Sequence, residues 1–443
     1  FDLKTKQGRH NNYALLKTKN VISGRNAMSK LWMYSTLMLS GSVWAGSFID
    51  NSSVELTTRN FYFDRDYQEQ SAYPAAKDWT QGFILKANSG YTEGTVGFGL
   101  DVLATAGFKL DADAEHGGTG NLPRDTRTNE PADSYGEIGV TAKAKMSQTE
   151  LRIGTLMPMN PVLVASPARL LPQTYRGISL TSKDIKDFDL QAAYLDKVNH
   201  RDSTNYEKIK ISGVNGRFKS AETDGLYYLG GNYQFNPALK LTAFYMDVDD
   251  LYNQTMVGAL HQHKINDTTN FSSQLRYYRS RDDGQAKAGL VDNDLYHAHF
   301  ELKHQNHKFI FGTFQHHGDT AFPYLTGGET GLLIDTWPGE FLNPKEKAYS
   351  FRYEYDFKDY VPGLRFMTRY TTGHNIYAPN LGGTNLKERE TDFDLGYTVQ
   401  SGWLKNLGLR ARYAIYDNNM LSTANIKPVN ETRINIDYTW KFK

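Results

Sequence analysis

The sequence contains no cysteine among its 443 residues. This absence excludes disulfide bonds, thiolate metal sites and cysteine nucleophiles. Long apolar runs are lacking too, since no stretch after residue 45 reaches the roughly 18 apolar residues of a membrane-spanning helix. The apolar fraction is 39% and the mean hydropathy is −0.58, so bulk composition gives no sign of a membrane protein.

Aromatic residues and glycine are abundant instead. The chain has 29 Tyr, 23 Phe and 38 Gly against 14 Pro. Low hydropathy combined with many aromatic residues is unusual for a soluble enzyme. It is typical of a membrane β-barrel, because each strand turns only alternate residues toward lipid.

A short segment near the N-terminus has the features of a secretory signal peptide. It begins with a short basic segment, Met28-Ser29-Lys30, and continues with an apolar centre over residues 31–43. It ends with a candidate cleavage site, Val43-Trp44-Ala45. We expect residues 1–27 to be a non-native or mis-annotated extension upstream of the natural start, residues 28–45 to be a signal peptide, and residues 46–443 to form a single outer-membrane barrel. Without residues 1–45 the chain is slightly acidic, which argues against nucleic-acid binding.

Period-two alternation recurs along the chain and predicts strands with one apolar and one polar face. It is found in residues 96–102, 349–357, 364–371 and 407–416. The clearest example is the C-terminal segment, in which Ile434, Ile436, Tyr438, Trp440 and Phe442 oppose Arg433, Asn435, Asp437, Thr439 and Lys441.

Short turns and long polar segments separate these alternating runs. Turns are expected at residues 236–237, 306–307, 361–363 and 404–406, and long loops at residues 111–135, 155–176, 316–345 and 374–390. Short turns at one rim and long loops at the other are typical of outer-membrane barrels. A soluble β-sandwich of this length would need several domains joined by linkers, and a propeller would need a fixed sequence repeat. We see neither feature. The sequence thus predicts an all-β, closed, antiparallel transmembrane barrel of about 18 strands.

Arginines occupy the polar faces of several predicted strands. An arginine facing lipid near the bilayer midplane would cost roughly 2–4 kcal/mol, so we expect these side chains inside the barrel. Same-face residues follow one another along a strand, which predicts a ladder of guanidinium groups able to bind carboxylates bidentately. Structural ion pairing with Glu354, Asp356 and Asp437 is an alternative role, and both can coexist. The predicted ladder comprises Arg352, Arg365, Arg369, Arg410, Arg412 and Arg433.

Two loops are candidates to narrow such a pore. The loop over residues 155–176 contains four prolines and is too apolar for a solvated external loop, and it places Arg169 and Arg176 near the predicted ladder. The loop over residues 316–345 supplies acidic groups that would face the bases and orient a zwitterion. Its candidate residues are Asp319, Glu329, Asp335 and Glu340.

Several short motifs occur in order along almost the whole of residues 46–443. They are Arg59-Asn60-Phe61-Tyr62-Phe63-Asp64-Arg65-Asp66, Asp78-Trp79-Thr80-Gln81-Gly82-Phe83, Gly118-Thr119-Gly120-Asn121-Leu122-Pro123, Arg169-Leu170-Leu171-Pro172-Gln173-Thr174, His317-Gly318-Asp319 and Val361-Pro362-Gly363-Leu364. Together these segments resemble the porin D (OprD) family of substrate-specific outer-membrane channels.

The resemblance implies an 18-stranded barrel in the outer membrane of a Gram-negative bacterium, surrounded by lipid and lipopolysaccharide. It implies a monomer or loose trimer that takes up small carboxylate or zwitterionic solutes, with basic amino acids and carbapenem antibiotics as the family's best-known cargo. It also places Arg59 and Arg169 in the ladder together with Arg410 and Arg412.

Other classes of function find less support in the sequence. The enzyme motifs G-x-S-x-G and H-E-x-x-H are absent, so we expect no catalysis and no cofactor. Close histidine pairs such as His297 and His299 offer fewer ligands than a zinc site needs. A receptor for large chelates would need a plug domain ahead of the first strand. A general, unselective porin remains the alternative.

Overall fold

The computed structural model describes residues 45–443 except 70, 335 and 422. The predicted extension and nearly all of the predicted signal peptide lie outside the described residues, and so does Asp335. The assignments of residues 1–27 and 28–45 therefore stay predictions.

The described chain is almost entirely β-structure, preceded by one short helix. No helix in this part of the chain is long and apolar enough to cross a membrane. The elements are α2 (Ala45–Asp50), β1 (Ser53–Tyr67), β2 (Ala75–Asn88), β3 (Gly97–Asp111), β4 (Ser134–Met146), β5 (Thr149–Leu156), β6 (Met159–Asn160), β7 (Leu163–Val164), β8 (Thr174–Ser182), β9 (Phe188–Asn199), β10 (Tyr206–Glu207), β11 (Ile209–Lys210), η1 (Val214–Gly216), β12 (Glu222–Thr223), β13 (Leu226–Asn236), β14 (Leu239–Val248), β15 (Tyr252–Asn266), β16 (Thr269–Asp282), β17 (Asp292–His304), β18 (His307–His317), β19 (Lys347–Asp356), β20 (Leu364–Ala378), η2 (Pro379–Leu381), β21 (Gly383–Thr398), β22 (Gly408–Asn418) and β23 (Val429–Lys441).

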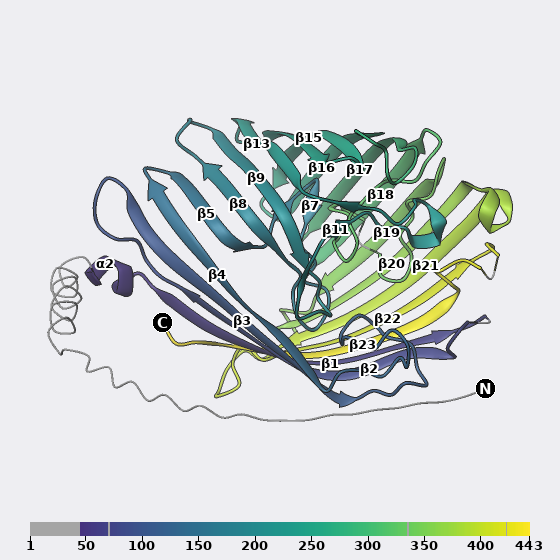
Figure 1. The fold of residues 1–443 in the computed structure, drawn as a ribbon, viewed down its shortest axis with the longest axis horizontal. Coiled ribbons are helices and arrows are strands. Elements are labelled where there is room, and N and C mark those ends of the chain that lie inside the picture. Colours follow the sequence, from purple (N-terminus) through teal and green to yellow (C-terminus); the bar gives the residue numbers. More distant parts are fainter. Residues whose placement is uncertain (1–44, 70, 335, 422) are drawn as a thin grey trace, which may run out of the picture. The chain divides into compact units, whose positions relative to one another are not determined.

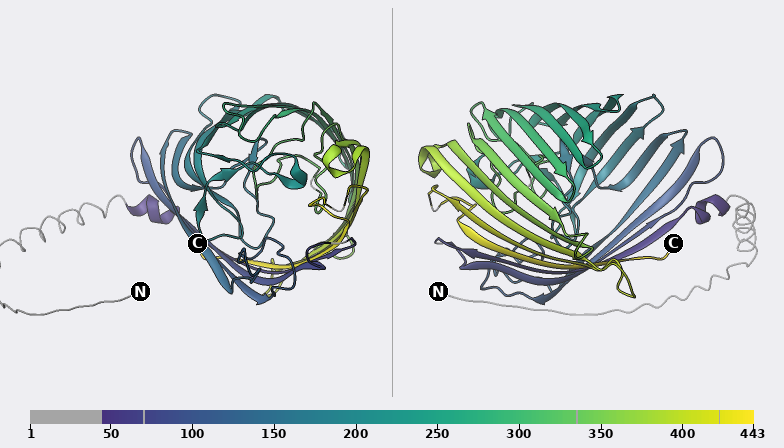
Figure 2. Two further views of the ribbon diagram at one scale, coloured as in Figure 1. Left: turned by 45° about the vertical axis from the view of Figure 1, so that its right-hand side comes forward. Right: turned by 180° about the vertical axis from the view of Figure 1, so that it is seen from behind.

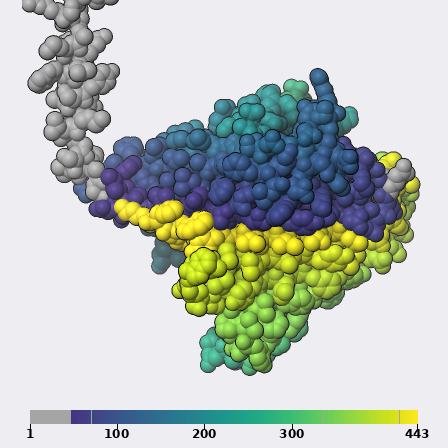
Figure 3. All heavy atoms as spheres, turned by 90° about the horizontal axis from the view of Figure 1, so that it is seen from below, coloured from purple at the N-terminus to yellow at the C-terminus, as the bar shows by residue number. Residues whose placement is uncertain are grey.

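Eighteen long strands in residues 47–443 form one closed antiparallel barrel, to which the two-residue β10 is added beside β9. Each long strand pairs with its neighbour in sequence, apart from the intervening short strands. The barrel closes because β1 pairs with both β2 and β23. Figure 1 and the two views of Figure 2 show the continuous ring of strands, and Figure 3 shows the N-terminal and C-terminal strands meeting along one seam. Closure leaves no unpaired sheet edge exposed to lipid.

Alternate side chains of the long strands face opposite sides of the wall, as predicted. On β19, Phe351 is 59% exposed on the outer face. Its neighbour Ser350 faces inward, where its hydroxyl lies 2.9 Å from that of Thr371 on β20. The outer face is therefore apolar enough for lipid while the inner face holds paired polar groups.

Turns and loops follow the predicted two-rim arrangement with one correction. Short turns join β13 to β14 and β17 to β18, whereas residues 112–133, 157–173 and 318–346 form long loops. The prediction of a long loop over residues 374–390 is wrong, because β20 continues to Ala378 and β21 begins at Gly383. The pairing there contains register shifts. Its polar sequence also lacks the apolar alternation that marks a lipid-facing strand.

Candidate functional site

The closure seam of the barrel places four predicted arginines on neighbouring strands. Arg412 on β22 pairs directly with Arg433 on β23, and Arg59 on β1 pairs directly with Asp437 on β23. Arg410 lies two residues before Arg412 on the same inward face. The backbone register thus brings residues that are more than 350 positions apart in sequence onto one patch of the inner wall.

This patch borders a cavity of about 750 Å³ inside the barrel. Seven arginines and three carboxylates line it, so its lining carries an excess of positive charge. We call the seven residues the arginine cluster: Arg59, Arg65, Arg169, Arg201, Arg410, Arg412 and Arg433. The carboxylates are Glu329, Glu340 and Asp437.

Carboxylates of the wall hold several members of the cluster in place. Arg59 Nε lies 2.9 Å from Asp437 Oδ1. Arg410 Nε lies 3.0 Å from Asp394 Oδ1. Glu431, which is fully buried, receives hydrogen bonds from Nε of both Arg65 and Arg433, at 2.6 and 2.5 Å. These ion pairs fix the direction of the guanidinium groups and partly neutralise them.

Arg169 reaches the cavity from the loop 157–173 and is held by backbone carbonyls. Its Nε donates to the carbonyl oxygen of Thr119 at 2.8 Å, and its own carbonyl accepts from Arg59 Nη1 at 2.7 Å. Burial lowers the pKa of the Arg169 guanidinium, and the positive charge of Arg201 lowers it further. The loop approaches the wall closely at Gly82, where a Cβ atom would lie 2.9 Å from Leu170 Cδ1.

The loop 318–346 is fastened to β21, the strand that pairs with β22. Glu390 on β21 accepts hydrogen bonds from the backbone N–H groups of Trp337 and Gly339, both at 2.6 Å. The two loops also bond to each other, since the N–H of Glu329 donates to the carbonyl of Val164 at 3.1 Å. Glu340 pairs with Arg217.

Trp337 brings an aromatic surface to the arginine cluster. Its ring centroid lies 5.6 Å from the guanidinium carbon of Arg412 and 5.9 Å from that of Arg433. A third guanidinium, from Arg369, lies 5.8 Å away. The site can therefore offer a planar solute both cationic hydrogen-bond donors and a ring for stacking.

The other predicted residues that the structure describes do not line the cavity. Arg369 is buried, with Nη2 2.6 Å from Asp392 Oδ2. Arg352 pairs with Glu354, and the side chain of Arg365 is 77% exposed near Asp356. Asp319 pairs with Lys345 at 3.1 Å on the exposed part of its loop. Arg176 belongs to β8 rather than to the predicted loop and pairs with Asp196.

Arg65, Arg201 and Trp337 line the cavity but were not predicted from the sequence, and one of them had a detectable signal. Arg65 shares the inward face of β1 with Arg59. Arg201 and Trp337 lie in loops, where no periodicity marks the direction of a side chain.

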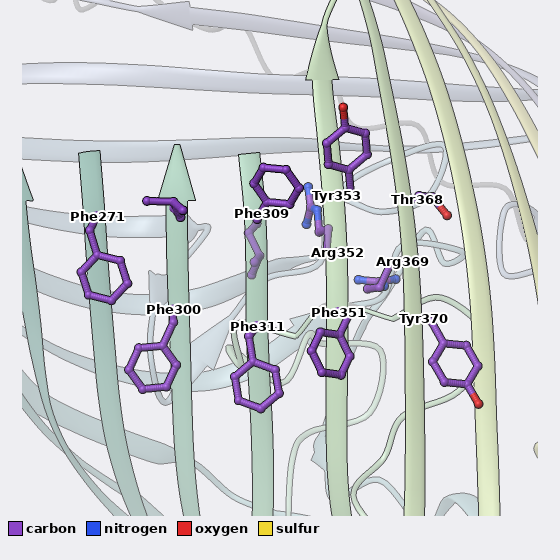
Figure 4. Close-up of a pocket in the computed structure, with 12 residues that line it drawn as sticks. Phe271, Phe300, Phe309, Phe311, Phe351, Arg352, Tyr353, Thr368, Arg369 and Tyr370 are labelled. Carbon is purple, nitrogen blue, oxygen red and sulfur yellow. The ribbon is translucent and has the colours of Figure 1, made fainter. Parts of the chain in front are cut away.

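A separate apolar hollow of about 470 Å³ lies on the outer face of β16–β20. Figure 4 shows its aromatic rings, among them Phe300, Phe311 and Phe351, side by side on adjacent strands. The Phe300 and Phe351 rings lie 6.3 and 5.0 Å from that of Phe311. Its lining is mostly aromatic and aliphatic, with Arg352 and Arg369 as its two charged residues, and the aromatic rings fit the lipid-facing band of a barrel.

A closed transmembrane barrel with a charged interior cavity defines the class of the protein as an outer-membrane porin. Residues 46–442 match the family model described as outer membrane porin, OprD family. The chain therefore belongs to the OprD family, and it is a channel of the Gram-negative outer membrane rather than an enzyme.

Individual relatives agree with this assignment. Porin D of Pseudomonas aeruginosa is 30% identical over 96% of this chain and 98% of its own. The crystal structure of Acinetobacter baumannii OccAB2 has 98% sequence identity and a TM-score of 0.87, covering 90% of this chain and 100% of its own. The crystal structure of Pseudomonas aeruginosa OpdK with vanillate has 33% identity and a TM-score of 0.82, covering 89% and 100%.

Proposed function

We propose that this porin passes small solutes that bear a carboxylate, basic amino acids and carbapenem antibiotics among them, along the arginine cluster. The observation that carries the proposal is the excess of arginine over carboxylate around the cavity. A diffusing anion exchanges its hydration shell for guanidinium donors, and several similar sites allow both capture and release.

Contacts of the two long loops support a narrowed passage beside the cluster. Loop 157–173 bonds to Arg59 on the wall, loop 318–346 bonds to Glu390 on the wall, and the loops bond to each other through Val164 and Glu329. A barrel this wide discriminates poorly unless its interior is filled, so these loops would confine solutes to the arginine-lined side. Glu329 and Glu340 would then attract the cationic end of a zwitterion.

Ion pairing of the wall and solute transport can coexist in the same residues. Arg410 is paired with Asp394, but its side chain remains 51% exposed and lines the cavity. Such a group can meet a passing solute while its carboxylate partner fixes its position. The vanillate of the OpdK structure also carries a carboxylate, which makes aromatic carboxylates reasonable first probes.

Solute-induced block of the open channel tests the proposal. We expect benzoate added to one side of a planar bilayer to interrupt the current, and Arg412→Gln to shorten or remove these interruptions. A neutral sugar of similar size should leave the current uninterrupted. Equal responses to benzoate and sugar would instead indicate a general diffusion porin.

A further inference from the structure

Phe63 is an aromatic residue on the inward face of β1, where polar side chains are expected. Its side chain is fully buried. It pairs directly with Arg433 of β23, and Arg65 follows two residues later on the same face. A phenylalanine at this position neither contacts lipid nor can donate a hydrogen bond to a solute, so its role must come from its contacts with neighbouring side chains.

Three guanidinium groups surround the Phe63 ring. Their Cζ atoms lie 4.5 Å (Arg433), 5.0 Å (Arg169) and 5.1 Å (Arg65) from the ring centroid. All three distances are within the range of cation–π attraction. The ring thus joins arginines from two strands and one loop.

Carboxylates balance this charge incompletely. Arg65 and Arg433 share the single carboxylate of Glu431. Among the described residues, Arg169 forms no ion pair within 4.0 Å and bonds to backbone carbonyls instead. Three like charges therefore meet in a largely buried site with one carboxylate, and the negative face of an aromatic ring supplies the further attraction.

We propose that Phe63 is a positioning residue for transport, whose ring electrostatics hold Arg169 and Arg433 at the cavity against their mutual repulsion. The role rests on the proposed function insofar as these arginines select anions. Phe61 extends the same surface, since its ring stacks on Phe63 with centroids 5.7 Å apart and lies 5.9 Å from Arg412.

Fluorinated phenylalanine separates ring electrostatics from ring shape. Trifluorophenylalanine at position 63 keeps the packing but weakens the negative ring face, and Phe63→Leu removes the aromatic ring. The readout is the benzoate-to-potassium permeability ratio, from the reversal potential of the refolded full-length barrel under a salt gradient. We expect the ratio to fall about two- to tenfold in both variants.

Phe314 provides the matched control, because it is equally buried but its ring contacts His297 and His316. Trifluorophenylalanine at position 314 should leave the permeability ratio unchanged. An unchanged ratio in both Phe63 variants, with a reduced ratio in Arg412→Gln, would overturn the role of Phe63. The proposed function would survive that result.

If the wild-type barrel shows no anion preference, the proposed function is contradicted. The contact between the Phe63 ring and Arg169 is then tested by a double-mutant cycle on thermal stability. Heat unfolding of Phe63→Leu, Arg169→Gln and the double variant should show non-additive losses if the ring holds the guanidinium. Additive losses would overturn the positioning role.

Discussion

Arg412 on β22 and Arg433 on β23 are direct cross-strand partners, and one indole ring lies within 6 Å of both guanidinium carbons. Two like charges in this arrangement would ordinarily destabilise a strand pair. Asn435 accepts a hydrogen bond from Arg412 Nη2 at 2.5 Å, while Glu431 accepts from Arg433. The pair keeps a positive field beside the cavity while each partner is held by a different neighbour.

Replacement of Arg412 should weaken the passage of carboxylates. We expect Arg412→Gln to lower benzoate permeability about three- to tenfold, because one charge-assisted donor site is lost. Uptake into liposomes containing the refolded barrel measures the effect. Arg176→Gln is the matched control, since Arg176 pairs with Asp196 away from the cavity. Equal effects of the two substitutions would contradict a local role of Arg412.

The stability of the loop 318–346 should depend on pH through the protonation of Glu346. Burial and the neighbouring charge of Glu388 raise the pKa of the Glu346 carboxyl. Its contribution to stability is therefore fully present below the unfolded-state pKa and is lost as pH rises through the higher folded-state pKa. We expect current noise from loop motion to increase as pH is raised from acidic to neutral, and Glu346→Gln to abolish that increase. An increase that persists in Glu346→Gln would assign the titration to another group.

The absence of a side chain at Gly373 makes room for the carboxyl group of Glu346. A Cβ atom at position 373 would lie 1.9 Å from Glu346 Oε1, so a side chain must displace the carboxyl. We expect Gly373→Ala to reduce the free energy of unfolding by roughly 1–3 kcal/mol through this overpacking. Urea unfolding followed by gel mobility measures it. Gly396→Ala is the control, because a Cβ there meets nothing within 4 Å, and a similar loss in both variants would contradict the explanation.

The sequence predicted the wall of the barrel better than its interior. Alternation identifies a strand face wherever lipid demands apolar side chains, as at Phe351 and Tyr370. On β1 the same rule does not identify the inward face, because Phe61 and Phe63 are apolar although they point toward arginines. Trp337 and Arg201 are positioned by loop contacts between distant segments, and no local pattern encodes such contacts.

Processing of the N-terminus gives a prediction that depends on the sequence alone. The signal features before residue 46 predict cleavage after Ala45, so that the mature chain begins at Gly46. Intact mass measurement of the protein extracted from outer membranes checks this. A mature chain that retains residues 28–45 would contradict the predicted boundary.

Single-channel recording of the refolded barrel tests carboxylate selectivity most directly. Arginine, a dicarboxylate and a neutral sugar would be added in turn to the wild type and to Arg410→Ala/Arg412→Ala. We expect brief current interruptions with the two carboxylate-bearing solutes, none with the sugar, and a loss of the interruptions in the double variant. Large conductance steps that respond to none of the three solutes would contradict a selective arginine-lined path.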